Sequence, residues 1–211
     1  MPQTIIQNSA NLNRWDVKQG HSPLSELAKS IYPQLSESTI QFIDEHSFHH
    51  SIRKGSHLLK EGNTCQYLFF IVKGAFRSYI KEDSKEVTTW ITLENQMITS
   101  IKGLYSEQPS NENIQAIEDS ILIGATYKDL NYLYEHYPDF NIVGRKLLEN
   151  YCDDADMRGF IGRIPKATTR YNYFMATNGN MVNRIPLKYI ASYLGIRLET
   201  LSRIRSKLDN L

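Results

Sequence analysis

The stretch Ile185-Pro-Leu-Lys-Tyr-Ile-Ala-Ser-Tyr-Leu-Gly-Ile-Arg-Leu-Glu-Thr-Leu-Ser-Arg-Ile-Arg-Ser-Lys-Leu208 decides the C-terminal part of the fold. It contains two short helical patterns separated by one glycine, Gly195. The apolar residues of the first pattern fall at i, i+3, i+4 and i+7 and share one helix face: Leu187, Ile190, Ala191 and Leu194. The small Ala191 allows a crossing helix to approach, and Gly195 can adopt the left-handed backbone conformation of a tight turn. The stretch predicts a helix-turn-helix whose core includes Ala191, Gly195, Leu201 and Ile204.

The second helical pattern has two opposed faces. Each residue turns the side-chain direction by about 100°, which groups the apolar residues Leu198, Leu201, Ile204 and Leu208 on one side. An exposed Arg can donate to guanine and an exposed Glu can accept from cytosine in the major groove. We therefore expect the opposite face to read base edges, through Glu199, Ser202 and Arg203. The residues expected to flank it and contact phosphates are Arg197, Thr200, Arg205, Ser206 and Lys207.

The charge is distributed unevenly along the 211 residues, although the net charge is only +1. Residues 1–162 carry 15 basic and 21 acidic side chains, whereas residues 163–211 carry 9 basic and 2 acidic ones. A polyanion such as DNA would be attracted to the C-terminal end. A well-solvated basic surface would give the same counts, so charge alone does not identify the partner.

Residues 50–126 have the composition of a β-domain. Runs of β-branched and aromatic residues alternate with Gly, Asn and Asp, which favours antiparallel hairpins over parallel winding. Two short helices are expected before this block, at Pro23–Ile31 and Ser38–His46. The expected strands are Ser56–Lys60, Tyr67–Val72, Ala75–Ile80, Glu86–Ile91, Met97–Ile101, Ile114–Glu118 and Ile121–Ala125.

One long helix is predicted from Pro138 to about Gly162. Alternate steps of three and four residues define a stripe along it: Phe140, Val143, Leu147, Asn150, Asp154, Met157 and Ile161. The stripe is typical of an imperfect coiled-coil seam, so we predict a dimer helix paired through Phe140, Val143, Leu147, Met157 and Ile161. A helix that packs only within its own subunit shows the same pattern and stays an alternative.

The sequence argues against a metal site, a cofactor and a membrane span. Cys65 and Cys152 are far apart and lack C-x-x-C spacing. No run of about 18 apolar residues occurs, and the first 20 residues are polar, so we expect a cytoplasmic protein.

An enzyme is not expected. A cupin-type metal enzyme is the only one that a β-domain with His49, His50 and His57 suggests. Adjacent histidines point to opposite faces of a strand, and His136 follows the β-block, so these side chains cannot converge on one ion. No Ser/His/Asp set or paired carboxylates stand in a recognisable motif.

The order of these segments resembles the Crp/Fnr family of bacterial regulators, over roughly His49 to Leu208. Tyr67–Gly74 resembles the family's strand ending in glycine, and Leu198–Ile204 resembles its recognition helix. The Glu-x-x-Ser-Arg pattern is closer to the FNR branch than to the cyclic AMP receptor branch, which implies a TTGA-like half-site. The resemblance implies an α+β fold with an N-terminal antiparallel, jelly-roll-like β-roll similar to cyclic-nucleotide-binding domains, a dimerisation helix and a C-terminal winged helix-turn-helix.

The same resemblance implies three parts and a function. The parts are a sensor domain with N-terminal helices at 1–137, a dimerisation helix at 138–164 and a helix-turn-helix DNA-binding domain at 165–211. The implied function is transcription regulation by a homodimer on a palindromic site in double-stranded DNA, with RNA polymerase as an allowed further partner. The alternative is a small-molecule-binding β-roll sensor whose C-terminal helices contact protein rather than DNA.

The effector site departs from the family pattern. Family members that bind a cyclic nucleotide meet its phosphate with an arginine, and Ser110, followed by Asn111, occupies that position here. Residues 103–127 contain no Lys or Arg. A buried charge left without its partner costs about 3–5 kcal/mol, so we expect no tight binding of cyclic AMP or cyclic GMP. The cysteine cluster of the FNR type is also absent, and the effector stays unidentified.

Overall fold

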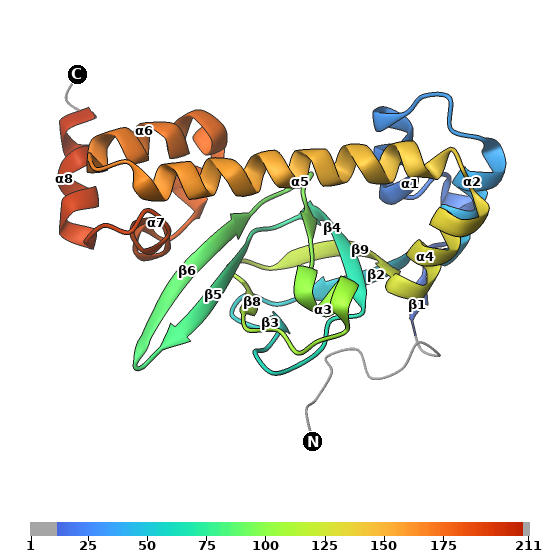
Figure 1. The fold of residues 1–211 in the computed structure, drawn as a ribbon, viewed down its shortest axis with the longest axis horizontal. Coiled ribbons are helices and arrows are strands. Elements are labelled where there is room, and N and C mark those ends of the chain that lie inside the picture. Colours follow the sequence, from blue (N-terminus) through green and yellow to red (C-terminus); the bar gives the residue numbers. More distant parts are fainter. Residues whose placement is uncertain (1–11, 209–211) are drawn as a thin grey trace.

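A long helix organises the molecule. The computed structural model describes residues 12–208, and within this range α5 (Phe140–Arg163) runs the length of the molecule (Figure 1). The N-terminal helices lie at one end of α5, the C-terminal helices at the other, and the strands lie along one side of its middle. The predicted helix from Pro138 to Gly162 is therefore confirmed to within two residues at each end.

The strands form two antiparallel sheets, which confirms the predicted β-roll. One sheet has the order β1-β2-β9-β4-β7 and the other the order β3-β8-β5-β6. The first sheet consists of β1 (Asn13–Arg14), β2 (Phe48–Ile52), β9 (Ser120–Thr126), β4 (Tyr67–Lys73) and β7 (Met97–Ile98). The second consists of β3 (His57–Leu59), β8 (Asn113–Ala116), β5 (Phe76–Glu82) and β6 (Lys85–Thr92).

The predicted strand Met97–Ile101 is wrong at its C-terminal end. The strand stops at Ile98, and α3 (Ile101–Ser106) begins after Ser100, whose side chain accepts a hydrogen bond from Gly103 N. A serine at this position satisfies a free N–H group of the first helical turn, which favours a helix over a longer strand. The strand β2 and the helix α4 (Tyr127–His136) were not predicted.

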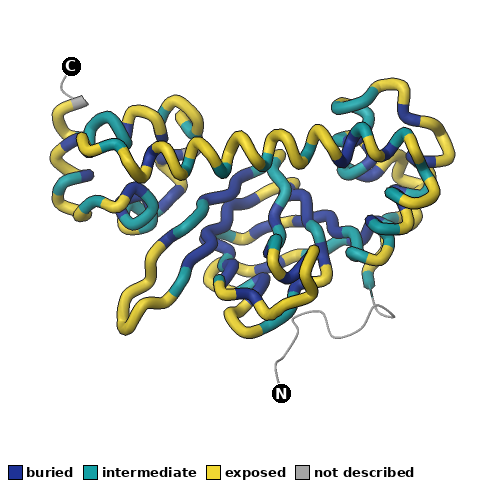
Figure 2. The backbone as a smooth tube through the Cα atoms, viewed as in Figure 1, coloured by how far each residue is buried: buried dark blue, intermediate teal, exposed yellow. Residues whose placement is uncertain are grey.

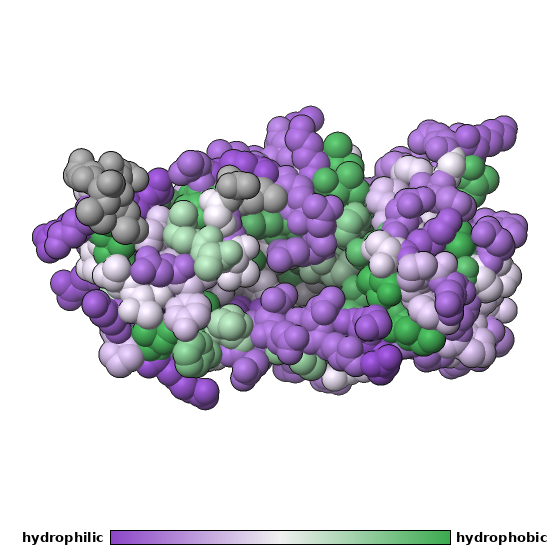
Figure 3. Space-filling model, turned by 90° about the horizontal axis from the view of Figure 1, so that it is seen from above, coloured by the Kyte–Doolittle hydropathy of each residue, from purple (hydrophilic) through white to green (hydrophobic). Residues whose placement is uncertain are grey.

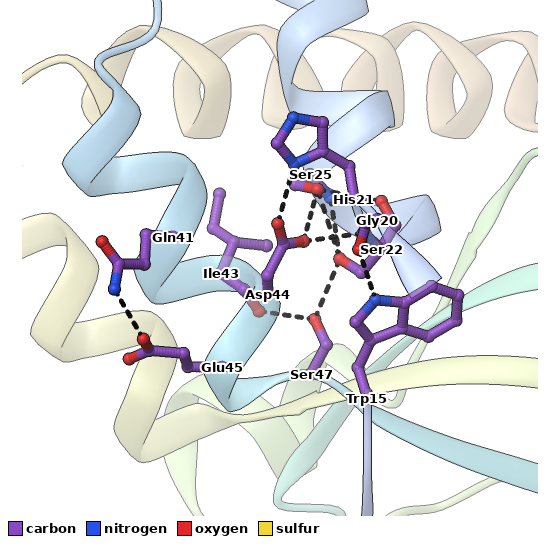
Figure 4. Close-up of polar contacts among 10 residues, drawn as sticks. All are labelled: Trp15, Gly20, His21, Ser22, Ser25, Gln41, Ile43, Asp44, Glu45 and Ser47. Atoms are coloured by element: carbon purple, nitrogen blue, oxygen red, sulfur yellow. Dashed lines mark hydrogen bonds and ion pairs between the residues drawn. The ribbon is translucent and has the colours of Figure 1, made fainter. Parts of the chain in front are cut away.

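The N-terminal helices are joined by a buried carboxylate. Asp44 lies on α2 (Glu37–His46), and its Oδ1 accepts hydrogen bonds from Ser22 N at 2.7 Å and from Ser25 Oγ at 2.6 Å at the start of α1 (Pro23–Ile31). The Nδ1 atom of His21 lies 2.9 Å from Oδ2 (Figure 4). These contacts hold the pKa of Asp44 below its usual value, although burial opposes them. The network fixes α1 against α2.

All the regular secondary structure in the described C-terminal part is helical. It contains α6 (Ala167–Asn178), the 3-10 helix η3 (Gly179–Arg184), α7 (Leu187–Tyr193) and α8 (Leu198–Leu208). The wing implied by the family resemblance is not confirmed, because no strand occurs between Ile164 and Leu208. The short helix η3 lies between α6 and α7 instead.

The apolar core is continuous between the β-roll and the C-terminal helices. One cluster of buried residues contains Phe174, Ile190, Leu194 and Leu201 from the C-terminal helices together with four residues of the β-roll: Ala75, Ile91, Leu93 and Ile117. A second cluster fills the roll between its sheets, and a third joins α1, α2, α4 and the start of α5. Figure 2, coloured by burial, shows buried residues in the β-roll and in the helices at both ends of α5.

Candidate functional site

The turn between α7 and α8 has the conformation that the sequence predicts. Gly195 has φ +62°, and Ile196 N donates to Ala191 O at 3.0 Å. A left-handed residue with this hydrogen bond ends a helix and turns the chain sharply. Three residues of the predicted helix-turn-helix core, Ala191, Leu201 and Ile204, are 3%, 0% and 8% exposed.

An arginine that no sequence motif singles out supports this turn. Arg170 on α6 donates from Nη1 to Leu194 O at 2.8 Å and from Nε to Ile164 O at 2.6 Å. It thus connects the end of α5 to the end of α7, and satisfies carbonyl groups that have no partner inside their helices. No pattern in the sequence pairs these distant positions.

The outer face of α8 is open. Glu199, Ser202 and Arg203 are all exposed, as a base-reading face requires. Arg203 takes part in none of the ion pairs among the described residues. Its guanidinium is therefore available to a partner that approaches from solvent.

The predicted flanking residues differ in their exposure. Arg197, Ser206 and Lys207 are exposed, whereas Thr200 is half-buried. Arg205 is half-buried and donates from Nη2 to Asn183 Oδ1 at 3.1 Å, which attaches α8 to η3. The apolar face also has an exception, because Leu198 is 42% exposed instead of buried. It lies in the first turn of α8, beyond the helices that cover Leu201 and Ile204. The side chain of Leu208 lies outside the described residues.

The β5–β6 hairpin contacts the helix-turn-helix directly. The Arg77 guanidinium on β5 lies 4.1 Å from the ring centroid of Tyr79 and 4.0 Å from that of Tyr189 on α7. Thr88 N on β6 donates to Ser192 Oγ on α7 at 2.9 Å. Since Arg77 is 4% exposed, this is a buried contact between the two halves of the chain.

A second contact between the halves is ionic. Arg184 binds Glu94 through two hydrogen bonds, Nη2 to Oε1 at 2.6 Å and Nη1 to Oε2 at 3.1 Å, and also pairs with Glu118. The hydrogen bonds from Arg184 hold the pKa of Glu94 below its usual value, against the opposing effect of burial. The position of η3 on the β-roll is thus fixed by a two-carboxylate clamp.

The predicted dimer seam on α5 is wrong for three of its five residues. Phe140 and Val143 are 6% and 1% exposed because they pack against the N-terminal helices, and Ile161 is 5% exposed within the C-terminal core. Leu147 is half-buried against the N-terminal cluster, and Met157 is 42% exposed. The stripe follows the subunit's own packing at both ends, as the alternative interpretation allowed.

The effector position at Ser110 is occupied by a buried, locally bonded side chain. Ser110 is 3% exposed, and its Oγ accepts from Glu112 N and donates to Glu112 O, both at 3.0 Å. The neighbouring Asn111 is exposed and accepts a hydrogen bond from Lys102 Nζ at 3.2 Å. Neither residue offers a cation.

A cavity of about 660 Å³ lies between the β-roll, α1 and α5. Ser110 and Asn111 line it, but so do apolar residues of α1, α4 and α5 that are far from them in sequence. The cavity also contains Arg158 from α5, a cation that lies well outside residues 103–127.

Other chemistry finds no support in the described part of the chain. No group of three or more His, Cys, Asp or Glu could hold a metal ion there, and no helix there is long and apolar enough to cross a membrane. Cys65 is buried and Cys152 exposed. His57 is half-buried beside the Tyr79 hydroxyl at 2.8 Å, and burial lowers the pKa of His50.

Known proteins resemble this chain in two ways, in the sequence of the β-roll and in the fold of most of the chain. Residues 49–137 match the family model of the cyclic nucleotide-binding domain. No curated protein matches the chain in sequence. Many solved structures resemble the fold, and three of them show the extent of the likeness. FixK2 from Bradyrhizobium japonicum is 20% identical, with a TM-score of 0.66 over 78% of this chain and 85% of that one.

The other two are similar in extent. CLP from Xanthomonas campestris, described as a c-di-GMP responsive global regulator, is 14% identical, with a TM-score of 0.64 over 83% of this chain and 92% of that one. A structure assigned to the Crp/Fnr family, from Eubacterium rectale, is 17% identical, with a TM-score of 0.64 over 85% of this chain and 86% of that one.

Proposed function

We propose that this chain, which has the Crp/Fnr-type fold around a cyclic nucleotide-binding domain, is a DNA-binding transcription regulator. The fold is that of regulators, which agrees with the expectation that the chain is not an enzyme. The proposed site of action is the cytoplasm, and RNA polymerase is a further partner that this function allows.

The exposed face of α8 carries the proposal. Glu199, Ser202 and Arg203 stand free on a helix whose other face is anchored by the buried Leu201 and Ile204. A recognition helix needs both properties, because its base-reading side chains must reach the major groove from a rigid support. The excess of basic residues after Gly162 supplies the sequence-independent attraction to phosphates.

We propose that the chain acts as a homodimer through the exposed face of α5. The residues on that face, all exposed except the half-buried Ala155, follow heptad spacing: Leu148, Cys152, Ala155, Gly159 and Gly162. Apart from the chain neighbours and the nearby backbone of the helix itself, no described atom lies within 4 Å of the place where a Cβ would stand at Gly159 or Gly162. Figure 3, which looks onto the side along which α5 runs, shows apolar side chains interrupting the polar surface over the middle of the molecule. This seam replaces the one proposed from sequence.

Oxidative cross-linking tests the seam. Two parallel helices that meet at this face bring Cys152 of each copy next to the other, close enough for a disulfide. Mild oxidation of the purified chain should give a dimer band that reducing agent removes and that Cys152→Ser abolishes. Cys65 is 6% exposed and serves as an internal control, since Cys65→Ser should cross-link normally. A dimer in solution that does not cross-link would place the interface elsewhere.

A two-fold dimer of this kind presents two recognition helices about 34 Å apart, one turn of DNA, and therefore binds a palindromic site. The Glu-x-x-Ser-Arg pattern favours a TTGA-like half-site. Sequencing of DNA fragments that co-purify with the chain tests this. The wild type should enrich a palindrome, and the enrichment should disappear with Arg203→Ala. Equal recovery with both proteins would favour the second function, a β-roll sensor whose C-terminal helices contact protein.

We also propose that the chain does not respond to cyclic AMP. The phosphate-binding arginine of the resembling proteins is replaced by Ser110, whose hydroxyl is already bonded to Glu112. Calorimetry with millimolar cyclic AMP should show no saturable binding. A dissociation constant in the low micromolar range would contradict the proposal.

A further inference from the structure

We propose that the cavity between the β-roll and α5 binds an amphipathic organic anion, a molecule with an apolar body and one acidic head group. The proposal adds to the proposed function by naming the class of effector. Only the word effector rests on that function, because ligand binding itself does not depend on it. Three observations support the proposal. They are the size of the cavity, its division into an apolar and a polar part, and an arginine outside any ion pair of the described residues.

The cavity has the dimensions of a small-molecule site. Its volume of about 660 Å³ falls inside the range of about 300–1,000 Å³ that is usual for organic ligands. It extends well beyond the loop that carries Ser110, because α1 and α4 contribute to its wall. The buried Asp44 network holds α1 in place, so this wall is fixed (Figure 4).

One end of the cavity is apolar. Its wall there comes from three helices, and its apolar lining includes Leu24 and Leu27 of α1, Leu130 and Leu133 of α4, and Leu147 of α5. Tyr134 also lines this end, and burial raises the pKa of its phenol to about 12, so the ring stays neutral. An apolar surface of this kind favours a hydrocarbon or aromatic group and offers nothing to a sugar or a second phosphate.

The other end contains a partly desolvated cation. The Arg158 guanidinium lies 2.9 Å from the ring centroid of Trp90, and Tyr151 lines the cavity with them. Glu112 and Asp154 are near enough to influence it, but neither lies within 4 Å as an ion pair. Burial lowers the pKa of Arg158, yet a guanidinium stays charged in proteins. An anion would supply the counter-charge that the described residues do not.

A distortion of strand β6 adds a further polar group to the cavity wall. The pairing of β5 with β6 shifts between Ser78 and Tyr79, which leaves Thr89 as an extra residue beside Trp90. Such a bulge re-aims side chains, and both Thr89 and Trp90 line the cavity. Thr89 Oγ1 is buried without a hydrogen-bond partner among the described residues. Its hydroxyl can donate to an acidic head group.

The charged residues that line the cavity are two cations, Arg158 and Lys102, and one carboxylate, Glu112, so the lining itself has a positive balance. Asp154 influences Arg158 as well, but it does not line the cavity. A single acid suits this balance better than a polyanion. A carboxylate and a phosphate monoester share this chemistry, and the experiment separates them.

Titration calorimetry of the full chain with four probes tests the proposal: decanoate, decyl phosphate, decan-1-ol and cyclic AMP. We expect saturable binding of decanoate, of decyl phosphate or of both, and the better of the two identifies the acid. Octanoate should bind about 16-fold more weakly than decanoate, because each buried methylene group contributes about fourfold. Decan-1-ol should bind at least about tenfold more weakly, because it lacks the charge that pairs with the guanidinium. Cyclic AMP should not bind.

Two variants locate the ligand. Arg158→Gln should weaken decanoate binding about tenfold or more, because the charge-assisted contact is lost. Lys146→Gln removes an exposed cation of the same helix outside the cavity and should change nothing. Leu27→Trp adds bulk at the apolar end and should weaken decanoate but leave butyrate unaffected. Circular dichroism checks that each variant is folded.

Several outcomes would overturn the proposal. Binding of neither decyl anion would exclude the ligand class, and equal binding of decan-1-ol would exclude the acidic head group. Equal affinity of wild type and a folded Arg158→Gln would place the anion elsewhere. Tight binding of cyclic AMP with inert decyl anions would make this a nucleotide site. None of these measurements involves DNA, so a failure of DNA binding is seen separately, through Arg203→Ala.

Discussion

Arg203 on α8 and Arg158 on α5 both stand outside the ion pairs of the described residues, but their surroundings differ. Arg203 is exposed on the outer face of a helix, whereas Arg158 is half-buried against Trp90 at the end of a cavity. A polyanion can reach the first by displacing only water and counterions. Only a small molecule can reach the second. Both arginines carry the same charge, so their accessibility decides whether each can bind a macromolecule or only a small molecule.

Of the two arginines, the exposed Arg203 is expected to give the largest effect when it is removed. Arg203→Ala should lower operator affinity about 100-fold or more, because a bidentate contact with guanine is worth about 1–3 kcal/mol and a dimer loses two. Fluorescence anisotropy with the enriched palindrome measures it. Lys207→Ala is the control and should weaken binding to all sequences alike, with a shallower salt dependence. Unchanged affinity in Arg203→Ala would remove α8 from the DNA interface.

The enclosed region is expected to resist added volume. Gly144 lines the cavity on α5, and a Cβ there would lie too close to the Tyr134 ring. Gly144→Ala should therefore destabilise the chain by about 1–3 kcal/mol, because a packed region must shift to accept the methyl group. Urea unfolding measures this change. A neutral result would show that this wall of the cavity yields easily, which would weaken the contrast between the two regions.

Gly159 gives the matched substitution on the open side of the same helix. No described atom beyond its own stretch of helix lies within 4 Å of the position that a Cβ would take there. Gly159→Ala should therefore stabilise the subunit by about 0.5–1 kcal/mol through its higher helix propensity. Urea unfolding at low protein concentration, where subunits are separate, is the measurement. A loss of stability there would mean that this face is not open within the subunit.

The smallest effect concerns a third arginine, which has carboxylates on both sides. Arg184→Gln breaks its pairs with Glu94 and Glu118. Arg184 is 38% exposed, so the loss at neutral pH should be under about 1 kcal/mol. The pKa of Glu94 is lowered in the folded chain, so the pair's contribution to stability is present above the usual glutamate pKa of 4.5 and is lost as the pH falls through the folded pKa.

Thermal unfolding from mildly to strongly acidic pH tests the sign of that effect. The melting temperature of the wild type should fall more steeply with acid than that of Arg184→Gln. Parallel curves would show that the clamp between η3 and the β-roll contributes nothing that depends on the ionisation of Glu94.

The helix-turn-helix could be predicted from sequence because its determinants are local. Ala191 and Gly195 are four residues apart, and the two faces of α8 repeat with the period of a single helix. Such patterns do not depend on how distant segments meet. The exception, Leu198, lies at the end of α8, where the apolar stripe continues past the residues that cover it.

The cavity and the dimer seam could not be predicted, because both depend on which segments meet in space. Phe140 and Ile161 look alike in the sequence, yet one packs against the N-terminal helices and the other in the C-terminal core. Arg158 lies 48 residues after Ser110 along the chain, and only the course of α5 over the β-roll brings it to the same cavity. The sequence around Ser110 therefore gives no sign of this cation.

The continuous core has a consequence for how the two halves of the chain behave. Ala75, Ile91, Leu93 and Ile117 belong to the roll but are buried with the residues that support α8. The C-terminal helices, cut away from the roll, would expose this apolar surface to water and lose part of their own support. The chain should therefore melt as a single cooperative unit, and an isolated fragment beginning near Pro165 should be prone to aggregate.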